Sequence, residues 1–438
     1  MHIILLSGGS GKRLWPLSND IRSKQFIKFF KNVNGVYESM LQRAYYRIRK
    51  IDSKATVIVA TEKSQVSTIL NQIGTDVEVS VEPCRRDTFP AIVLASLYLK
   101  DIKKVNEDEV VVVCPVDAYV GDEYFEALKR LAKQVEKGKS NIVLMGIEPT
   151  YPSEKYGYII TSTNESVSEV ESFKEKPNKE MADMYIKRGA LWNGGVFAYK
   201  LGYIIKKAIE LININNYSDL YEKYACLPKI SFDYAVVEKE RKIEVMKFKG
   251  IWKDIGTWNT LTESIPDLTT GNAIIDNSCD NVHVINETDI PVLAMGLKDI
   301  VIAASPEGIL VSDKEKTSKI KPFVEKIEQQ VMFAEKSWGT FRILQVGNGC
   351  MTVKLAIKSG QMLNYHSHRN RNEVWICIGG TGQTIVDGVK ETVNSGDVVA
   401  IRAGCKHTVK AITELQLIEI QLGNEISSGD KIKYELEL

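Results

Sequence analysis

The pattern of apolar and polar residues along this 438-residue chain changes twice, and these changes constrain the fold more than any single motif. Within residues 1–262, continuous apolar runs such as 55–61 and 109–117 alternate with helical patterns. Such runs suit strands that are buried on both faces of a parallel sheet, and their alternation with helices favours an open α/β fold. We therefore predict one α/β domain over residues 1–262.

The remainder of the chain has a different pattern. Residues 263–330 contain short apolar segments separated by Asn, Asp and Gly, followed by a helical pattern at 316–330. This predicts a β-rich linker domain, built as a small sheet or as one to two coils of a β-helix. Residues 331–438 read as β structure throughout, which predicts a separate C-terminal β domain.

Composition excludes several classes of protein. Lys plus Arg number 57 and Asp plus Glu number 56, so a net charge of +1 gives no general attraction to nucleic acid or to an anionic membrane. Apolar runs stay below the roughly 18 residues of a membrane span, and the N-terminal apolar stretch is too short for a signal peptide. The seven cysteines are scattered, which is typical of reduced thiols in a cytoplasmic protein.

A glycine-rich loop follows the first predicted strand. Glycines let the backbone approach a phosphate closely, and successive N–H groups can form an anion-binding nest. The basic side chains of Lys12 and Arg13 can neutralise a triphosphate. The spacing matches neither the Walker A loop nor GxGxxG. From glycine content alone, the loop is either a structural Gly/Ser turn or a nucleotide-binding site formed by a continuous run of residues: Ser7, Gly8, Gly9, Ser10, Gly11, Lys12 and Arg13.

The whole string from Ser7 to Ser18 resembles the signature of sugar-nucleotide pyrophosphorylases, in particular mannose-1-phosphate guanylyltransferases, which reads GGxGTRLWPLSR. Lys12 replaces the usual threonine, and Ser23 replaces the proline of the PKQF motif that follows. Ala118 stands in place of a histidine in a later motif. Further motifs of this family follow in order, and the resemblance extends to about residue 325; they lie at 82–91, 115–117, 156–159, 173–177, 191–197, 231–235, 252–258 and 296–299.

The resemblance implies a Rossmann-like nucleotidyltransferase domain of the GT-A-like type and a set of site residues. Asp117 and Asp254 would hold Mg²⁺, which prefers oxygen ligands, and Asp117 directly follows an apolar strand, where open α/β sheets bind ligands. Arg13, Lys24 and Asp117 would be the catalytic residues. Further nucleotide contacts would be Glu82, Arg86 and Asp87, and the sugar phosphate would contact Gly157, Glu175, Lys176 and Asn193.

Three of the five histidines lie in the spacing typical of a cupin β-barrel. His366 and His368 are two residues apart, so they point to the same face of a strand, while Glu373 and His407 complete both cupin motifs. Three histidines and one carboxylate suit a divalent transition metal such as Zn²⁺, Fe²⁺ or Mn²⁺. Arg402 replaces the usual proline of the second motif.

A cupin attached to a guanylyltransferase resembles the bifunctional type that also isomerises mannose-6-phosphate. The isomerase pattern HRxEHW corresponds to residues 368–375, where this chain is two residues longer and has Val374 in place of the second histidine. The segment Ser337-Trp338-Gly339 does match the entry of that domain. Isomerase activity therefore stays open at this point.

We expect an enzyme that converts GTP and mannose-1-phosphate into GDP-mannose and pyrophosphate. One alternative keeps the chemistry but takes CTP or another triphosphate with a different phosphorylated substrate, since Asp87, Phe89 and Ala118 depart from the family pattern. Another treats the cupin as a non-catalytic binding or oligomerisation module. A homodimer is one option for the assembly.

Overall fold

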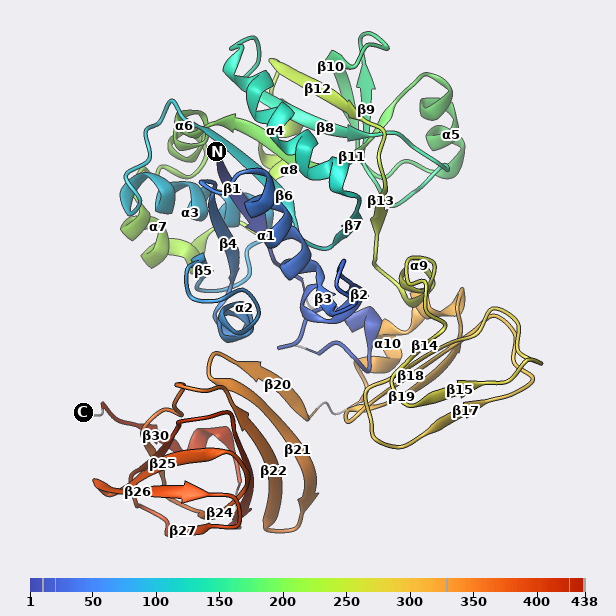
Figure 1. Ribbon diagram of the computed structural model, residues 1–438. Coiled ribbons are helices and arrows are strands. Elements are labelled where there is room, and N and C mark those ends of the chain that lie inside the picture. The colour runs from blue at the N-terminus through green and yellow to red at the C-terminus, as the bar shows by residue number, and fades with distance from the viewer. Residues whose placement is uncertain (10–11, 20, 328–329, 425, 436–438) are drawn as a thin grey trace. The chain divides into compact units, whose positions relative to one another are not determined.

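The computed structural model describes residues 1–9, 12–19, 21–327, 330–424 and 426–435, without the side chains of Lys12 and Ser428 (Figure 1). The chain forms two compact units. The first comprises Met1–Arg13, Ser23–Val66 and Ile73–Pro266, and the second comprises Leu14–Arg22, Ser67–Gln72 and Asp267–Leu438. Neither unit is a continuous stretch of sequence.

A mixed nine-stranded sheet forms the centre of the first unit. Four neighbouring strands, β5, β4, β1 and β6, run parallel, as the apolar runs predict. Strand β11 is antiparallel to both of its neighbours, so the complete sheet is mixed rather than parallel. In spatial order the strands are β5 (Glu78–Glu82), β4 (Thr56–Glu62), β1 (His2–Leu6), β6 (Val110–Pro115), β11 (Leu191–Lys200), β8 (Ile142–Ile147), β12 (Ile243–Phe248), β10 (Val167–Lys174) and β9 (Tyr158–Thr161).

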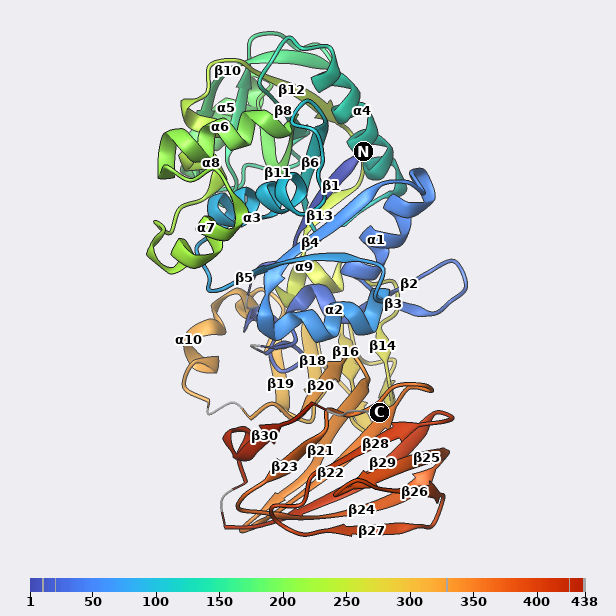
Figure 2. The same cartoon turned by 90° about the vertical axis from the view of Figure 1, so that its left-hand side faces the viewer.

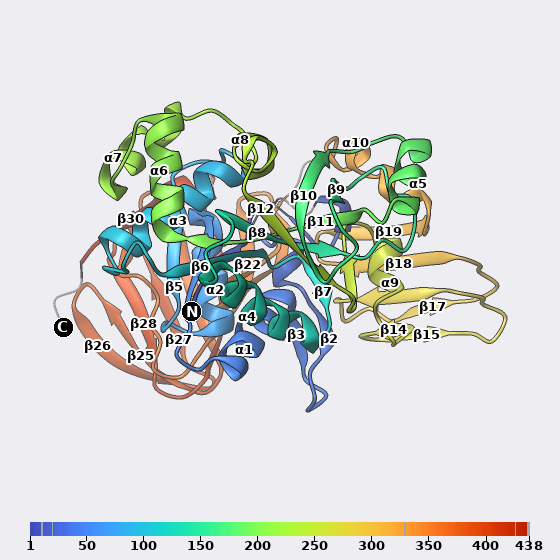
Figure 3. The ribbon, with the colours of Figure 1, turned by 90° about the horizontal axis from the view of Figure 1, so that it is seen from above.

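Helices cover both faces of this sheet (Figure 3). The nearly all-apolar helix α3 packs on β1, β4 and β5 beside α6, and α4 packs on β6, β8 and β11 at the opposite face. Each large apolar side chain buried in this way contributes about 1.5–3 kcal/mol. The α-helices that precede the linker are α1 (Met40–Ile51), α2 (Val66–Ile73), α3 (Thr88–Asp101), α4 (Asp122–Glu136), α5 (Lys179–Lys187), α6 (Leu201–Ile212), α7 (Tyr217–Lys223), α8 (Phe232–Ala235) and α9 (Trp258–Thr262).

Two small antiparallel pairs complete the first unit. Strand β2 (Lys28–Lys31) pairs with β3 (Tyr37–Ser39), and Ser39 begins α1 with a capping box that includes Gln42. Strand β7 (Ala118–Val120) pairs with β13 (Trp252–Asp254), and Asp254 lies opposite Ala118 in this register. The second pair joins two segments that are far apart in the sequence.

The linker in the second unit is a short β-helix. Successive strands alternate between two parallel sheets, which share a small core of Val282, Val284, Ala294 and Ile302. The strands are β14 (Thr269–Thr270), β15 (Ala273–Ile275), β16 (His283–Asn286), β17 (Val292–Ala294) and β18 (Ile300–Ser305), with β19 (Gly308–Asp313) returning antiparallel to β18.

The helix expected over 316–330 does not form as one element. The described part of this stretch contains a 3₁₀ turn, Lys316–Lys319, and a four-residue helix, α10 (Lys321–Val324). Pro322 lies in the first turn of α10, where it lacks the N–H that a continuous helix would need. The prediction was therefore wrong in length.

The C-terminal domain is built from two facing sheets, as expected for a cupin (Figure 2). Alternate inward side chains, including Trp375, Leu417 and Val409, form its core. One sheet contains β20 (Phe333–Lys336), β21 (Gly339–Gly347), β22 (Cys350–Ile357), β29 (Leu415–Leu422), β24 (Asn372–Gly379) and β27 (Val398–Ile401). The other contains β26 (Val389–Asn394), β25 (Thr381–Val386), β28 (His407–Ala411), β23 (His366–His368) and β30 (Lys431–Lys433).

Candidate functional site

The glycine-rich loop is tied to the segment that carries Lys24. The hydroxyl of Ser23 donates to the Gly9 carbonyl at 2.7 Å, and Nε2 of Gln25 donates to the Ser7 carbonyl at 3.0 Å. Gln65 in turn donates to the Ser23 hydroxyl at 2.8 Å. These hydrogen bonds hold Lys24 beside the loop.

Lys24 lies between the two predicted magnesium ligands. Its Nζ is 2.9 Å from Oδ2 of Asp117 and 3.5 Å from Oδ1 of Asp254, and it donates to the Ile255 carbonyl at 3.0 Å. Burial alone would lower the pKa of Lys24, but the two carboxylates outweigh it and raise that pKa, so the amine is charged. The β7–β13 pairing is what brings the two carboxylates together.

Both carboxylates are accessible. The side chains of Asp117 and Asp254 are 37% and 38% exposed, whereas Lys24 is only 14% exposed. Mg²⁺ prefers oxygen ligands and usually keeps several of its waters while one or two carboxylates bind it. Two solvent-accessible carboxylates therefore fit this ion.

A cavity of about 360 Å³ lies beside the loop. Six of the predicted residues line it: Ser7, Gly8, Gly9, Glu82, Asp87 and Asp117. Glu62, Gln65, Arg85, Thr88 and Lys229 also line it and were not predicted. A cavity of this size beside a glycine loop can hold a nucleotide.

The two adjacent arginines face different surroundings. Arg85 lines the cavity and donates from Nε to Glu62 at 2.9 Å, whereas Arg86, the predicted contact, is absent from the lining and donates to the Ala225 carbonyl. Asp87 has a φ of 70° and caps α3 by accepting from the Thr88 amide at 2.8 Å. Asp87 itself lines the cavity together with Arg85.

A second polar group gathers the predicted sugar-binding residues. The backbone N–H of Asn193 donates to the Gly157 carbonyl at 2.8 Å. A Cβ added to Gly157 would lie 2.6 Å from Oε2 of Glu175. Asn193 also donates from Nδ2 to Asp233 at 2.6 Å. Lys176 forms an ion pair with Glu175. Glycine at 157 therefore leaves room for the carboxylate.

Asp233 is a member of this group that the sequence prediction omitted. Burial is the main cause that raises its pKa to about 6, with Glu175 adding repulsion. Carboxylates and amides of this kind accept and donate hydrogen bonds to sugar hydroxyls. Its position inside the 231–235 motif was the available signal.

The remaining loop predictions are only partly visible. Ser10 and Gly11 lie outside the described residues, as does the side chain of Lys12. Arg13 is exposed in the 3₁₀ turn Lys12–Leu14 and is not among the residues that line the cavity. Its catalytic role stays a prediction.

The cupin brings together all four of its predicted metal ligands. His366, His368, Glu373 and His407 are buried, and their ligand atoms all lie within 4.8 Å of one another. Nδ1 of His366 is 2.6 Å from the Asn364 carbonyl, and Nδ1 of His407 is 2.9 Å from the Cys405 carbonyl. Each Nδ1 must carry the proton in such a contact, which leaves Nε2 as the ligand atom.

The electrostatics of the cluster also suit a metal. Burial, with Lys431 nearby, lowers the pKa of His366 to about 3, so this imidazole is neutral as a ligand must be. Nε2 of His407 is buried and makes no hydrogen bond within the described structure. This donor set fits a divalent transition metal.

A cavity of about 390 Å³ opens beside this cluster. His366 and Arg371 line it, together with Glu419 and three lysines: Lys336, Lys431 and Lys433. Burial raises the pKa of the Glu419 carboxyl to about 7, with Glu373 as a second cause. The cavity combines positive charge with a group that can exchange a proton near neutral pH.

The fold and the loop define a nucleotidyl transferase. Residues 2–271 match the family model described as Nucleotidyl transferase, and the chain belongs to that family. Residues 325–436 match the model described as Mannose-6-phosphate isomerase C-terminal. Both predicted parts are therefore confirmed at the level of family and fold.

Similar proteins align over nearly the whole chain. A mannose-1-phosphate guanylyltransferase of Escherichia coli K12 is 26% identical over 99% of this chain and 98% of its own. One from Salmonella montevideo is 28% identical over 98% of each chain. A crystal structure described as mannose-1-phosphate geranyltransferase, from Thermus thermophilus, superposes with a TM-score of 0.64 at 28% identity, covering 75% of this chain and 98% of the other.

Proposed function

We propose that this enzyme converts GTP and mannose-1-phosphate into GDP-mannose and pyrophosphate. The observation that carries the proposal is Lys24 held between Asp117 and Asp254 beside the glycine loop. The names of the relatives that align over nearly the whole chain support mannose as the sugar and guanine as the base.

In the reaction an oxygen of the sugar phosphate attacks the α-phosphorus in line, and pyrophosphate leaves. The attacking sugar phosphate and the leaving pyrophosphate are both ionised at neutral pH, so catalysis mainly requires that the enzyme position them and neutralise their charge. Mg²⁺ bound to Asp117 and Asp254 would supply charge neutralisation at the phosphates. Lys24, Lys12 and Arg13 would bind phosphate oxygens, while backbone amides of Gly8 and Gly9 would cradle the triphosphate.

The acceptor would lie at the group around Gly157. Glu175, Asn193 and Asp233 would fix the sugar hydroxyls, and Lys176 would contact the phosphate. Glu82, Arg85 and Asp87 line the nucleotide cavity, and in this proposal they would select the base.

A matrix of the four nucleoside triphosphates against several sugar 1-phosphates tests this choice, with pyrophosphate release as the readout. We expect the fastest release with GTP and mannose-1-phosphate. A preference for CTP would instead support the cytidylyltransferase alternative. Release from no pair by folded protein would reject nucleotidyl transfer altogether.

For the cupin we propose a divalent Zn²⁺, Fe²⁺ or Mn²⁺ and interconversion of mannose-6-phosphate with fructose-6-phosphate. The supporting observation is the cavity that combines His366 with Lys336, Lys431 and Lys433, which suits a phosphorylated sugar. The ligands to the metal would be His366, His368, Glu373 and His407.

A coupled assay for fructose-6-phosphate tests the isomerase proposal. We expect activity that a chelator removes and that His407→Ala abolishes. Pyrophosphate release by His407→Ala, measured with Mg²⁺ present, should equal that of the wild type. Absence of interconversion in metal-loaded protein would favour a non-catalytic binding or oligomerisation module.

The seven cysteines are all free thiols, which supports a cytoplasmic location. Within the described chain, no helix combines the length and apolarity that a membrane crossing requires. A homodimer remains part of the proposal, and sedimentation would test it.

A further inference from the structure

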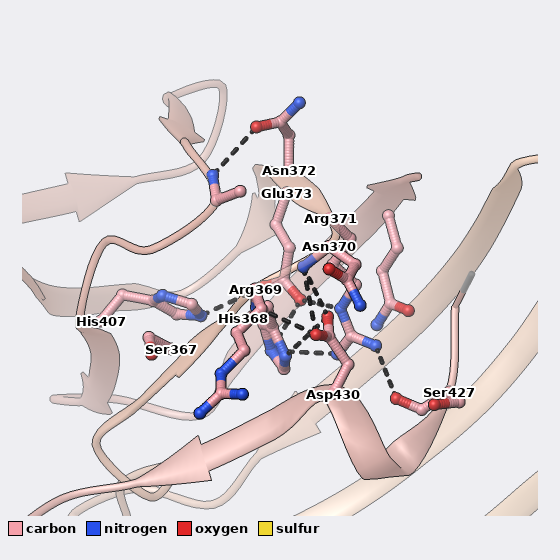
Figure 4. Close-up of polar contacts among 12 residues, drawn as sticks. Ser367, His368, Arg369, Asn370, Arg371, Asn372, Glu373, His407, Ser427 and Asp430 are labelled. Carbon is pink, nitrogen blue, oxygen red and sulfur yellow. Dashed lines mark hydrogen bonds and ion pairs between the residues drawn. The ribbon is translucent and has the colours of Figure 1, made fainter. Parts of the chain in front are cut away.

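Arg371 occupies an unusual position inside the cupin metal cluster. It belongs to the segment between β23 and β24 that is two residues longer than the isomerase pattern, and it is only 8% exposed. Its Nε donates to Oε1 of Glu373 at 3.0 Å, and its Nη2 lies 2.9 Å from Nε2 of His368 (Figure 4). The guanidinium therefore bridges two of the four proposed metal ligands.

The contact with His368 uses the atom that a metal would need. Nε2 of His368 faces the cluster, 3.1 Å from Glu373, whereas Nδ1 lies 3.8 Å from Asp430 on the other side. Arginine has only donors, so the hydrogen bond with Arg371 makes Nε2 the acceptor, and the same atom then cannot donate to Glu373, 3.1 Å away. A neutral imidazole nitrogen has one lone pair, which can accept this proton or bind a metal but cannot do both.

The charges of the cluster lead to the same conclusion. The Glu373 carboxylate and the Arg371 guanidinium lie 3.0 Å apart in a buried site, so their charges balance each other. A divalent ion added with the guanidinium in place would leave two uncompensated positive charges close together, which is costly at low dielectric. Removal of the guanidinium lowers that excess to one.

A displaced guanidinium would have somewhere to go. Arg371 and Glu419 line the same cavity of about 390 Å³, which provides both room and a second carboxyl group. Nη1 of Arg371 already reaches the Ser427 carbonyl at 3.3 Å, outside the metal cluster.

We propose that Arg371 is a metal-displaced residue: it holds His368 and Glu373 in the metal-free cupin and moves toward the cavity when a divalent ion binds. This rests on the metal site proposed above. Arg371 thereby weakens metal binding, and metal occupancy delivers a guanidinium to the cavity where an anionic ligand would bind.

Titration of the full-length protein with Co²⁺ tests this proposal, because coordination by histidine gives Co²⁺ a visible absorption band. Excess Mg²⁺ would occupy the transferase carboxylates, and His407→Ala would identify the signal from the cupin. We expect Arg371→Met to bind Co²⁺ about 10- to 100-fold more tightly than the wild type, since two charged hydrogen bonds need not be broken. Arg369→Met, at an exposed neighbour in the same segment, should leave the affinity unchanged.

Equal or weaker binding by folded Arg371→Met would overturn the displacement. Absence of binding by every variant would remove the metal site itself, and the displacement with it. If Arg371→Met fails to fold, Arg371→Lys keeps a cation but loses the planar fork, and we expect it also to bind more tightly than the wild type. Crystal structures with and without metal decide independently: a four-ligand ion with Arg371 still 2.9 Å from His368 would refute the proposal.

Discussion

Asp233 offers a test of the sugar site that does not depend on activity. Its carboxyl is largely buried, accepts a hydrogen bond from Asn193 at 2.6 Å and lies near the charge of Glu175. These surroundings raise its pKa from the ordinary value of 3.8 to about 6. This difference between the two pKa values means that the ionised carboxyl destabilises the folded protein by about 3 kcal/mol.

The sign follows from the raised pKa. Below pH 3.8 the carboxyl is protonated in both folded and unfolded chains and carries no penalty, whereas above pH 6 the folded protein bears the full cost of a buried charge. Asp233→Asn keeps the acceptor for Asn193 but cannot ionise. We expect the variant to be more stable than the wild type by up to about 3 kcal/mol at pH 8 and by about half of that at pH 5.

Urea unfolding of both proteins at several pH values measures this difference. Asp108→Asn, at a side chain that is 89% exposed, is the matched control and should show no such trend. A difference that stays constant with pH, or a variant that is less stable at pH 8, would refute the reasoning. The more stable variant should also have a higher KM for the sugar phosphate, because a carboxylate that binds hydroxyls is lost.

Four further substitutions have distinct expected effects. Gly157→Ala should lower kcat/KM on the order of 100-fold, because the added Cβ would lie 2.6 Å from Oε2 of Glu175 and would push that carboxylate away. An unchanged kcat/KM in steady-state kinetics would contradict the placement of the sugar site. Arg85→Met should raise KM for the triphosphate about 10-fold or more, whereas Arg86→Met should lower the melting temperature and leave KM unchanged; the reverse pattern would restore Arg86 as the nucleotide contact. Glu419→Gln should lower hexose 6-phosphate interconversion at least about 100-fold without affecting pyrophosphate release, and full isomerase activity would exclude proton transfer by this carboxyl.

The sequence predicts chemistry at strand ends better than it predicts which side chains meet. Asp117 could be placed after β6, and Asp254 in a turn, but their meeting depends on the pairing of β7 with β13, across more than a hundred residues. Local patterns carry no information about such a pairing. The family resemblance supplied it instead.

The direction of individual side chains was the second feature that the sequence could not predict. Arg85 and Arg86 are adjacent residues of the same type, and the local sequence does not indicate that Arg85, rather than Arg86, lines the cavity. Spacing alone was sufficient in the cupin, because His366 and His368 share one face of a strand. The same spacing could not predict that Arg371 would enter the cluster, since the loop before β24 sets its direction.

Labelled GTP tests the central proposal, in-line transfer at the site of Lys24, Asp117 and Asp254, most directly. With mannose-1-phosphate and Mg²⁺, we expect an α-phosphate label to appear in the nucleotide sugar and a γ-phosphate label to appear in pyrophosphate. Asp254→Asn should slow both by at least about 100-fold, while Asp108→Asn keeps the wild-type rate. Transfer of the α-label at full rate by folded Asp254→Asn, or no transfer by the wild type, would contradict the proposed site.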